Sequence, residues 1–191
     1  MPDKCPWLPP QDEAAYVYLV GLYLGDGTIQ KVGRTAQLRI FLDDHYPGIQ
    51  DECAAAIVAA TGARVSRVRR AGCTVVSSYS LHWKCLFPQH GPGRKHTRKI
   101  ELAGWQQRLV DDHPASLIRG LIHSDGCRDQ NIVKDRAYPR YSFSNRSDEI
   151  HEIFRAAVTR VGATYTVKPF VTSIARRKDV AIMDHFVGPK Y

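Results

Sequence analysis

The alternation of apolar and polar positions divides the chain into two stretches with the same order of elements. A nearly unbroken apolar run, Ala14–Gly25, predicts a buried helix, and the run that begins at Leu117 predicts a second one. Each run is followed by an alternating stretch that predicts a strand and by an amphipathic stretch with a glycine stop that predicts a helix. The strands are expected around 38–42 and 140–144, and the helices around 49–58 and 150–158.

Two further strand-like runs and a helical end are expected in each stretch. The strands are predicted at 64–68 and 73–80 in the first stretch, and at 164–168 and 172–175 in the second. The order in each is helix, two strands, helix, two strands, helix. We therefore expect a first half over 1–95, a connecting segment over 96–112 with a helix near 101–111, and a second half over 113–191. This pattern predicts an α+β fold built from two pseudo-symmetric αββαββα halves.

The two apolar helices share a motif in which Gly-Leu is followed by three residues and then by Asp-Gly. Gly21 and Gly25 lie four apart in the first copy, and Gly120 and Ser124 keep that spacing in the second. Small residues on one helix face let two backbones approach, so we expect the motif helices to pack together at the centre of the molecule. We expect the glycine after each aspartate to adopt a left-handed cap. Asp12 is expected to cap the first helix without a capping box.

The charge balance points to an anionic partner. The 191 residues carry 27 Lys and Arg against 19 Asp and Glu, a formal net charge of +8. A basic protein of this kind is typical of nucleic-acid binding, although charge alone does not identify the partner. Five scattered cysteines without a Cys-x-x-Cys pair indicate reduced thiols. The apolar run is too short to cross a bilayer, so we expect a cytoplasmic protein, associated with the nucleoid if the host is a prokaryote.

Asp26 and Asp125 carry the most specific chemistry in the sequence. A carboxylate at a helix C-terminus is disfavoured by the helix dipole, and two such carboxylates close together repel each other. Divalent cations relieve both penalties, and carboxylate and carbonyl oxygens suit Mg²⁺. We therefore expect a metal site at Asp26 and Asp125 with the backbone carbonyls of Gly25 and Ser124. An ordinary turn explains a single Asp-Gly pair, but two matching copies favour a shared site.

The paired motifs resemble those of the LAGLIDADG, or dodecapeptide, homing endonucleases, in the monomeric form with two motifs per chain. The resemblance runs from about Gln11 to Lys190. Val20 and Arg119 stand where the family has alanine, and Leu24 and His123 stand where it has its first aspartate.

The resemblance implies a fold and a set of site residues. It implies saddle-shaped antiparallel sheets whose concave face lies in the DNA major groove. It implies that Asp26 and Asp125 hold divalent metal at the scissile phosphates and that a basic residue late in each half, Lys95 and Lys190, stabilises charge there. Polar residues that position water are expected at the ends of the first strand pairs, at His45 and Asn145.

This chemistry is coherent for phosphodiester hydrolysis. Negative charge develops on the phosphate and on the leaving oxygen, and Mg²⁺ or Mn²⁺ ions together with a lysine stabilise it. The sequence thus predicts a monomeric, metal-dependent endonuclease that hydrolyses a long, pseudo-palindromic duplex DNA target.

DNA contacts are expected from basic and amide side chains on the strands and loops. The candidates are Gln30, Arg34, Arg39, Arg64, Arg67, Arg69, Arg70, Lys84, Arg128, Gln130, Asn131, Arg140, Arg176, Arg177 and Lys178. We expect the cluster at 64–70 and the cluster at 176–178 to occupy equivalent places on one sheet face.

Four alternatives compete with the nuclease. A non-cleaving DNA-binding protein, such as a transcriptional regulator on the same scaffold, needs the basic sheet but not the acids. A structural or protein-interaction module needs neither. A zinc site made of Cys73, Cys85, His90 and His96 is disfavoured by its long spacings. An intein is disfavoured because the terminal residues lack the nucleophile and the His-Asn pair of that class.

Overall fold

The structure is a computed structural model that describes Cys5 and residues 9–190. The elements of the first half are α1 (Glu13–Asp26), β1 (Gly27–Val32), β2 (Thr35–Asp43), α2 (Pro47–Thr61), β3 (Ser66–Arg70), β4 (Cys73–Ser80), α3 (Trp83–Leu86) and the short helix η1 (Lys95–Thr97). The connecting segment contains α4 (Gly104–Asp112). The second half contains α5 (Pro114–Asp125), β5 (Gly126–Val133), β6 (Arg136–Ser144), α6 (Asp148–Arg160), β7 (Thr166–Lys168), β8 (Val171–Ile174) and α7 (Arg177–Asp184).

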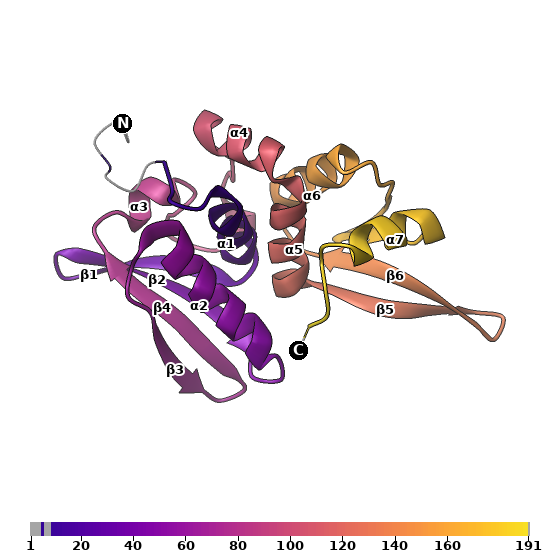
Figure 1. Cartoon of the computed structure of the whole chain (residues 1–191), viewed down its shortest axis with the longest axis horizontal. Helices are drawn as coiled ribbons and strands as arrows, with labels where there is room; N and C mark the ends of the chain where they lie inside the picture. Colours follow the sequence, from indigo (N-terminus) through magenta and orange to yellow (C-terminus); the bar gives the residue numbers. More distant parts are fainter. Residues whose placement is uncertain (1–4, 6–8, 191) are drawn as a thin grey trace.

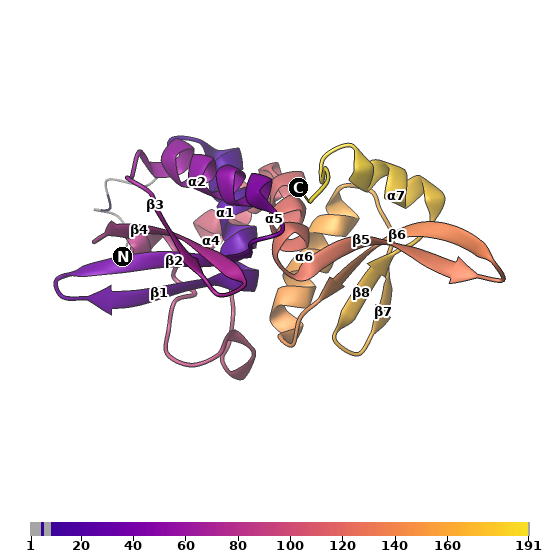
Figure 2. The same ribbon diagram turned by 90° about the horizontal axis from the view of Figure 1, so that it is seen from below.

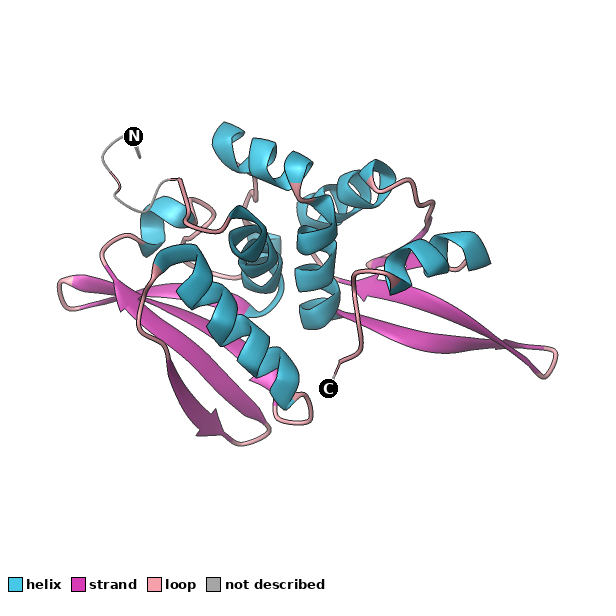
Figure 3. Cartoon of the chain, viewed as in Figure 1, coloured by secondary structure: helices cyan, strands magenta, loops and turns pink. Residues whose placement is uncertain are grey.

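The predicted α+β architecture is confirmed. Each half contains a four-stranded antiparallel sheet, in the order β1-β2-β4-β3 in the first half and β5-β6-β8-β7 in the second. The helix pair α1 and α5 lies between the two sheets, which extend from it in opposite directions (Figure 1). The view from below and the view coloured by structure type show the same division (Figures 2 and 3). The predicted element order holds, and most predicted strand ends lie within two residues of the observed ones, but β2 begins three residues and β6 four residues earlier than expected.

The seam between α1 and α5 depends on small residues. A Cβ atom added to Gly21 would lie 2.6 Å from the carbonyl oxygen of Leu117 and 2.8 Å from the Cα of Gly120. A Cβ atom on Gly120 would overlap the carbonyl oxygen of Tyr18. The two backbones therefore touch at these glycines, which explains why they stand inside helices where glycine costs about 1 kcal/mol relative to alanine.

The helices cover only one face of each sheet. On β2, Leu38, Ile40 and Leu42 are buried in the core, while the alternating residues Gln37 and Arg39 point to the other face. In the second half, Phe143 on β6 packs against Phe154 on α6 with ring centroids 4.5 Å apart. We call the face away from the helices the open face of each sheet.

The glycine after each motif aspartate does not form a left-handed cap, so that expectation was wrong. Gly27 has φ −93° and Gly126 has φ −114°, both extended. At both positions the chain passes directly from the helix into a strand. A glycine is needed there because a side chain would not fit. A Cβ on Gly27 would lie 2.5 Å from the Cα of Tyr23, and one on Gly126 would lie 2.7 Å from the Cα of Ile122.

The expected cap of α1 is present. The side chain of Asp12 accepts a hydrogen bond from the backbone N–H of Ala15 at 2.9 Å. This contact satisfies one of the free donors of the first helical turn.

The residues at which the second motif departs from the family pattern tie the halves together. Arg119 on α5 forms an ion pair with Glu52 on α2, with Nη2 and Oε1 2.7 Å apart, and it also donates to the carbonyl of Phe186. His123 contacts the hydroxyl of Tyr18 at 2.9 Å and the carbonyl of Val187 at 3.0 Å. Burial lowers the pKa of His123 to about 4, so the ring is neutral at pH 7.

None of the helices in the described part of the chain is long and apolar enough to cross a membrane.

Candidate functional site

The two motif aspartates end their helices side by side. Asp26 is the last residue of α1 and Asp125 the last residue of α5. A Cβ on Gly25 would lie 3.1 Å from Oδ2 of Asp125, so the two helix ends are in contact. Burial and the neighbouring Asp125 carboxylate raise the pKa of Asp26 to about 6. Burial also raises the pKa of Asp125. The seam thus concentrates negative charge where the helix dipoles disfavour it.

A lysine from each half reaches the corresponding motif. Nζ of Lys95 donates to the carbonyl oxygen of Gly25 at 2.8 Å, and Nζ of Lys190 donates to that of Ser124 at 3.4 Å. Both lysines interact electrostatically with both aspartates. Burial lowers the pKa of Lys95 to about 8 and also lowers the pKa of Lys190. The four charged groups repeat the same arrangement in the two halves.

Each ammonium also lies over an aromatic ring that sequence reasoning did not single out. Nζ of Lys95 is 5.1 Å from the ring centroid of Tyr23, and Nζ of Lys190 is 5.7 Å from that of Tyr46. A cation over a ring face is attracted by the ring quadrupole. The rings therefore help to orient the lysines.

The two residues expected to position water have different surroundings. Nδ2 of Asn145 donates to Oδ2 of Asp125 at 2.6 Å, and its Oδ1 accepts from the backbone N–H of Ser147. Asn145 is therefore held at the acidic pair. His45 has a side chain that is 86% exposed and contacts Asp43 at 2.6 Å, with no contact to either motif aspartate. His45 is therefore not held at the acidic pair as Asn145 is.

The oxygens at this point fit a divalent cation. In the described part of the chain no hydrogen bond reaches the Asp26 carboxylate, so its oxygens are available to a ligand. Carboxylate oxygens of this kind suit Mg²⁺, Mn²⁺ and Ca²⁺. The carbonyls of Gly25 and Ser124, also expected as metal ligands, accept hydrogen bonds from the two lysines. A carbonyl oxygen has a second lone pair, so this contact leaves one acceptor position on each.

An open cavity lies against the acidic pair. It has a volume of about 620 Å³, and its lining includes Lys95, Asp125 and Asn145. Two arginines that sequence reasoning missed, Arg94 and Arg146, also line it. Each is adjacent in sequence to a residue that was singled out, which is the signal that could have identified it. The cavity is therefore rich in cations beside the carboxylates, as a site for a phosphate group would be.

Comparisons with known proteins agree at the level of the fold. No family model matches the sequence, and no curated protein matches it. Solved structures do: I-DmoI in complex with DNA and Mn has a TM-score of 0.62 over 94% of this chain and 99% of that chain, at 14% identity. I-WcaI bound to its DNA recognition sequence has a TM-score of 0.55, with 15% identity, over 95% of this chain and 83% of that chain.

A third similar structure, the N-terminal LAGLIDADG domain of DUF199/WhiA, has a TM-score of 0.54 and 12% identity, over 96% of this chain and 86% of that chain. The chain has the LAGLIDADG fold. With identities between 12% and 15%, these structures establish the fold and leave the activity to be argued from the site.

The strand register decides which candidate DNA contacts share the open faces of this LAGLIDADG fold. Residues opposite each other in neighbouring strands point to the same face, so the buried side chains of β2 and β6 fix the direction of their neighbours. The candidates on the open faces are Gln30, Arg39, Arg70, Asn131 and Arg140. Arg39 donates to Gln30 at 3.2 Å, and Arg140 pairs with Asp129 at 2.8 Å.

Four candidates point to the helix side, so the expectation of a single basic sheet face was wrong for them. Arg67 pairs with Asp51 on α2 at 2.5 Å, and Arg69 pairs with Asp44 at 3.4 Å. Arg128 pairs with Asp184 on α7 at 2.8 Å, and Gln130 has the same strand parity. Consecutive residues of a strand face opposite ways, so a dense cluster is necessarily divided between the two faces.

The remaining candidates lie outside the strands. Arg34 is in the β1–β2 turn, Arg64 precedes β3, and Lys84 is in α3. Arg176, Arg177 and Lys178 form the start of α7, after β8. The expected equivalence of 176–178 with 64–70 was therefore wrong, because the counterpart of β3 is β7.

Proposed function

We propose that this protein is a divalent-metal-dependent endonuclease that cuts duplex DNA at a specific site. The observation that carries the proposal is the repeated acid and lysine arrangement at the ends of α1 and α5. Asp26 and Asp125 lie together with raised pKa values, and Lys95 and Lys190 each donate to the carbonyl that precedes one of them. A purely structural seam between two helices does not need two partly buried carboxylates at its end.

The roles of the residues follow from this geometry. Asp26 and Asp125 would hold Mg²⁺ or Mn²⁺, which stabilises charge on the attacking and leaving oxygens and lowers the pKa of bound water. Lys95 and Lys190 supply positive charge near the reacting phosphates. Nδ2 of Asn145 donates one of its two hydrogens to Oδ2 of Asp125 at 2.6 Å. The second amide hydrogen is left to orient a water molecule.

The open sheet faces supply the DNA contacts in this proposal. Arg39, Arg70 and Arg140 lie there with the amides of Gln30 and Asn131, a mixture of phosphate-binding and base-reading side chains. The two sheets extend in opposite directions from the helix pair α1 and α5, whose last residues are the two aspartates (Figure 2). One chain can therefore contact both sides of a cut, so we propose a monomer on a long target. The target is only pseudo-palindromic because the two faces carry different residues.

A cleavage screen tests the proposal. Purified protein is incubated with a randomised duplex library and with host genomic DNA, in Mg²⁺, Mn²⁺ or Ca²⁺, and the ends are sequenced. We expect defined double-strand cuts with Mg²⁺ or Mn²⁺ and none from the Asp26→Asn or Asp125→Asn variants. The matched control is Asp135→Asn, at an acidic residue in the exposed β5–β6 turn. Cuts that persist in both motif variants would refute the assignment of the acids.

A non-cleaving DNA-binding protein is the second candidate. The similarity to the LAGLIDADG domain of WhiA favours it, and so does the exposed position of His45, whose side chain contacts Asp43 and not the acidic pair. Specific binding of duplex DNA without metal-dependent cuts would establish this candidate in place of the nuclease. No binding to duplex DNA at low salt would reject both, because either function requires the basic faces.

A further inference from the structure

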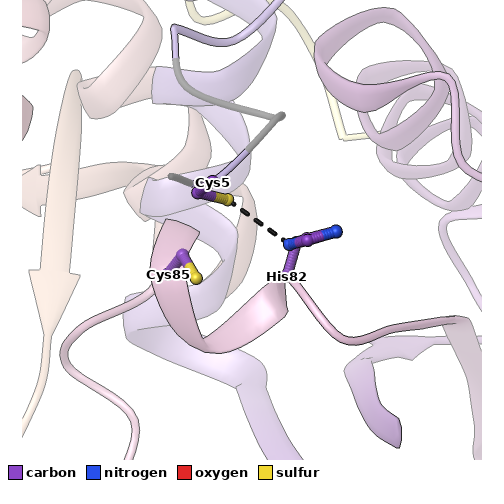
Figure 4. Close-up of side chains that lie close together, drawn as sticks. All are labelled: Cys5, His82 and Cys85. Atoms are coloured by element: carbon purple, nitrogen blue, oxygen red, sulfur yellow. Dashed lines mark hydrogen bonds between the residues drawn. The ribbon is translucent and has the colours of Figure 1, made fainter. Parts of the chain in front are cut away.

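A group of metal-ligating side chains lies away from the acidic pair. Cys5, His82 and Cys85 offer one ligand atom each, and the three atoms lie within 4.8 Å of one another. Sγ of Cys5 is 3.6 Å from Nδ1 of His82. Figure 4 shows the Cys5 sulfur facing the His82 ring, with Cys85 beside them in the first turn of α3. None of the three lines the cavity at Asp125.

We propose that Cys5, His82 and Cys85 form a zinc site that links Cys5 to α3 and to the residue before it. Two sulfurs and an imidazole nitrogen are the donor set that Zn²⁺ prefers, whereas Mg²⁺ and Ca²⁺ prefer oxygen. This set differs from the one considered from the sequence, since only Cys85 is common to both.

The distances agree with tetrahedral coordination. Bonds of about 2.3 Å to sulfur and about 2.0 Å to nitrogen place the two ligand atoms about 3.6 Å apart at the tetrahedral angle. The separation of Cys5 Sγ and His82 Nδ1 is 3.6 Å. Two cysteine sulfurs on one zinc are about 3.8 Å apart, so movement of the third ligand by about 1 Å or less completes the set. Water can take the fourth position.

Two of the ligands are fixed in place by the fold. His82 precedes α3, and its carbonyl accepts from the N–H of Cys85 at 3.0 Å, so His82 and Cys85 lie one turn apart. Trp83, between them, is fully buried, and its indole N–H donates to the carbonyl of Ser78 at 2.9 Å. Because Trp83 anchors this segment in the core, His82 and Cys85 are in position before a metal ion binds.

The third ligand comes from the opposite end of the first half. Cys5 is 77 positions from His82 in sequence and only 8% exposed. A metal bond at this point closes a long loop, which restricts the unfolded chain and favours the folded one. The site is therefore structural and independent of DNA cleavage. Zinc should raise the melting temperature of the protein.

Metal analysis of the full chain tests the proposal. Protein purified with a phosphine reductant, which keeps the thiols reduced, and dialysed against zinc is expected to retain about one zinc ion per chain. Cys85→Ser and His82→Gln are each expected to weaken zinc binding at least about tenfold. Cys73→Ser, at a partly exposed thiol on β4, is the matched control and should bind as the wild type does.

Cobalt distinguishes this site from the acidic pair and does not depend on how the variants fold. Titration of the reduced wild-type protein with Co²⁺ should produce a thiolate-to-cobalt charge-transfer band and the visible bands of a tetrahedral ion. The Asp26→Asn/Asp125→Asn double variant should keep both, because carboxylates cannot produce a thiolate band. The absence of a thiolate band in the wild type, or equal zinc content in the wild type and in both ligand variants, Cys85→Ser and His82→Gln, would overturn the proposal.

Discussion

The ammonium nitrogen of Lys95 lies 2.8 Å from the carbonyl oxygen of Gly25, the residue before Asp26. Lys190 makes the matching contact with Ser124, the residue before Asp125, at 3.4 Å. Each lysine is thus held by the end of a helix, where the carbonyls carry partial negative charge. The dipole that disfavours the aspartates favours the lysines. The helix ends therefore gather both signs of charge in a small volume.

Replacing Asp26 with asparagine should stabilise the protein while abolishing cleavage. Its pKa is raised from 3.8 to about 6, so the folded protein binds more protons than the unfolded chain between those values. The free energy of unfolding therefore falls as the pH rises through this window, and the loss remains at neutral pH. Each pKa unit corresponds to about 1.4 kcal/mol, and the raised pKa already includes the attraction to the lysines. Because the carboxylate is only partly buried and solvent screens it, we expect a gain of about 1–2 kcal/mol.

Urea denaturation of the wild type and of Asp26→Asn at several pH values measures this effect. The difference in the free energy of unfolding between the two proteins should shrink below pH 4, where Asp26 of the wild type is protonated and therefore as neutral as the asparagine. A difference that stays constant with pH would contradict the raised pKa of Asp26.

The pH dependence of cleavage should carry the signature of Lys95. Burial lowers the pKa of Lys95 to about 8, so the positive charge is lost as the pH rises through that value. We expect kcat/KM to fall above about pH 8, and Lys95→Arg to move this limb to higher pH because arginine stays charged. Lys99→Arg, at an exposed lysine paired with Glu101, is the control that should leave the profile unchanged. If kcat/KM of Lys95→Arg falls at the same pH as that of the wild type, the alkaline fall belongs to another group.

Gly120→Ala should destabilise the seam between the halves. The added Cβ would overlap the carbonyl of Tyr18, and the overpacked helices must separate. We expect a loss of about 1–3 kcal/mol, although alanine is the better helix former by about 1 kcal/mol. Gly104→Ala is the matched control because its Cβ would meet nothing within 4 Å. Thermal unfolding of both variants checks the prediction, which fails if they behave alike.

Arg70 and Arg67 should differ in their effect on DNA binding. They belong to the same strand, but Arg70 lies on the open face, and Arg67 pairs with Asp51 on the helix side. Arg70→Ala should weaken binding and lower the salt dependence, measured as log K against log salt, by about one unit. Arg67→Ala should leave both nearly unchanged. Fluorescence anisotropy over a range of salt concentrations measures them, and the reverse ranking would place DNA on the other side of the sheet.

The ion pair of Arg119 and Glu52 should contribute to the docking of the halves. Both side chains are mostly buried, 30% and 22% exposed, and they join α5 to α2. A double-mutant cycle with Arg119→Met and Glu52→Gln should give a coupling energy of about 1–3 kcal/mol. The exposed pair of Lys99 and Glu101 should couple by less than about 1 kcal/mol. Equal coupling in the two cycles would mean that the first pair is not part of the seam.

Much of the fold was predictable because its signals are local. Periodicity located the repeated elements, and Cys73–Ser80 was placed without error. Pairs of small residues predicted the packing of the motif helices. The left-handed caps were mispredicted because a glycine after a helix has two explanations, a positive φ or a lack of space, and local sequence does not separate them. The sequence also did not predict which face of the sheet each arginine points to. That direction depends on where each strand begins and how it pairs with its neighbour.

The sequence by itself determined the duplicated architecture, the small-residue seam and the presence of two carboxylates at the helix ends, because these follow from residue type and spacing along a continuous segment. The tertiary structure decided what surrounds them. Asn145 meets Asp125, Arg67 and Arg69 turn to the helix side, and Cys5 meets His82 and Cys85 only after distant segments are packed together. Contacts across such separations depend on register and chain crossing, which no local pattern encodes.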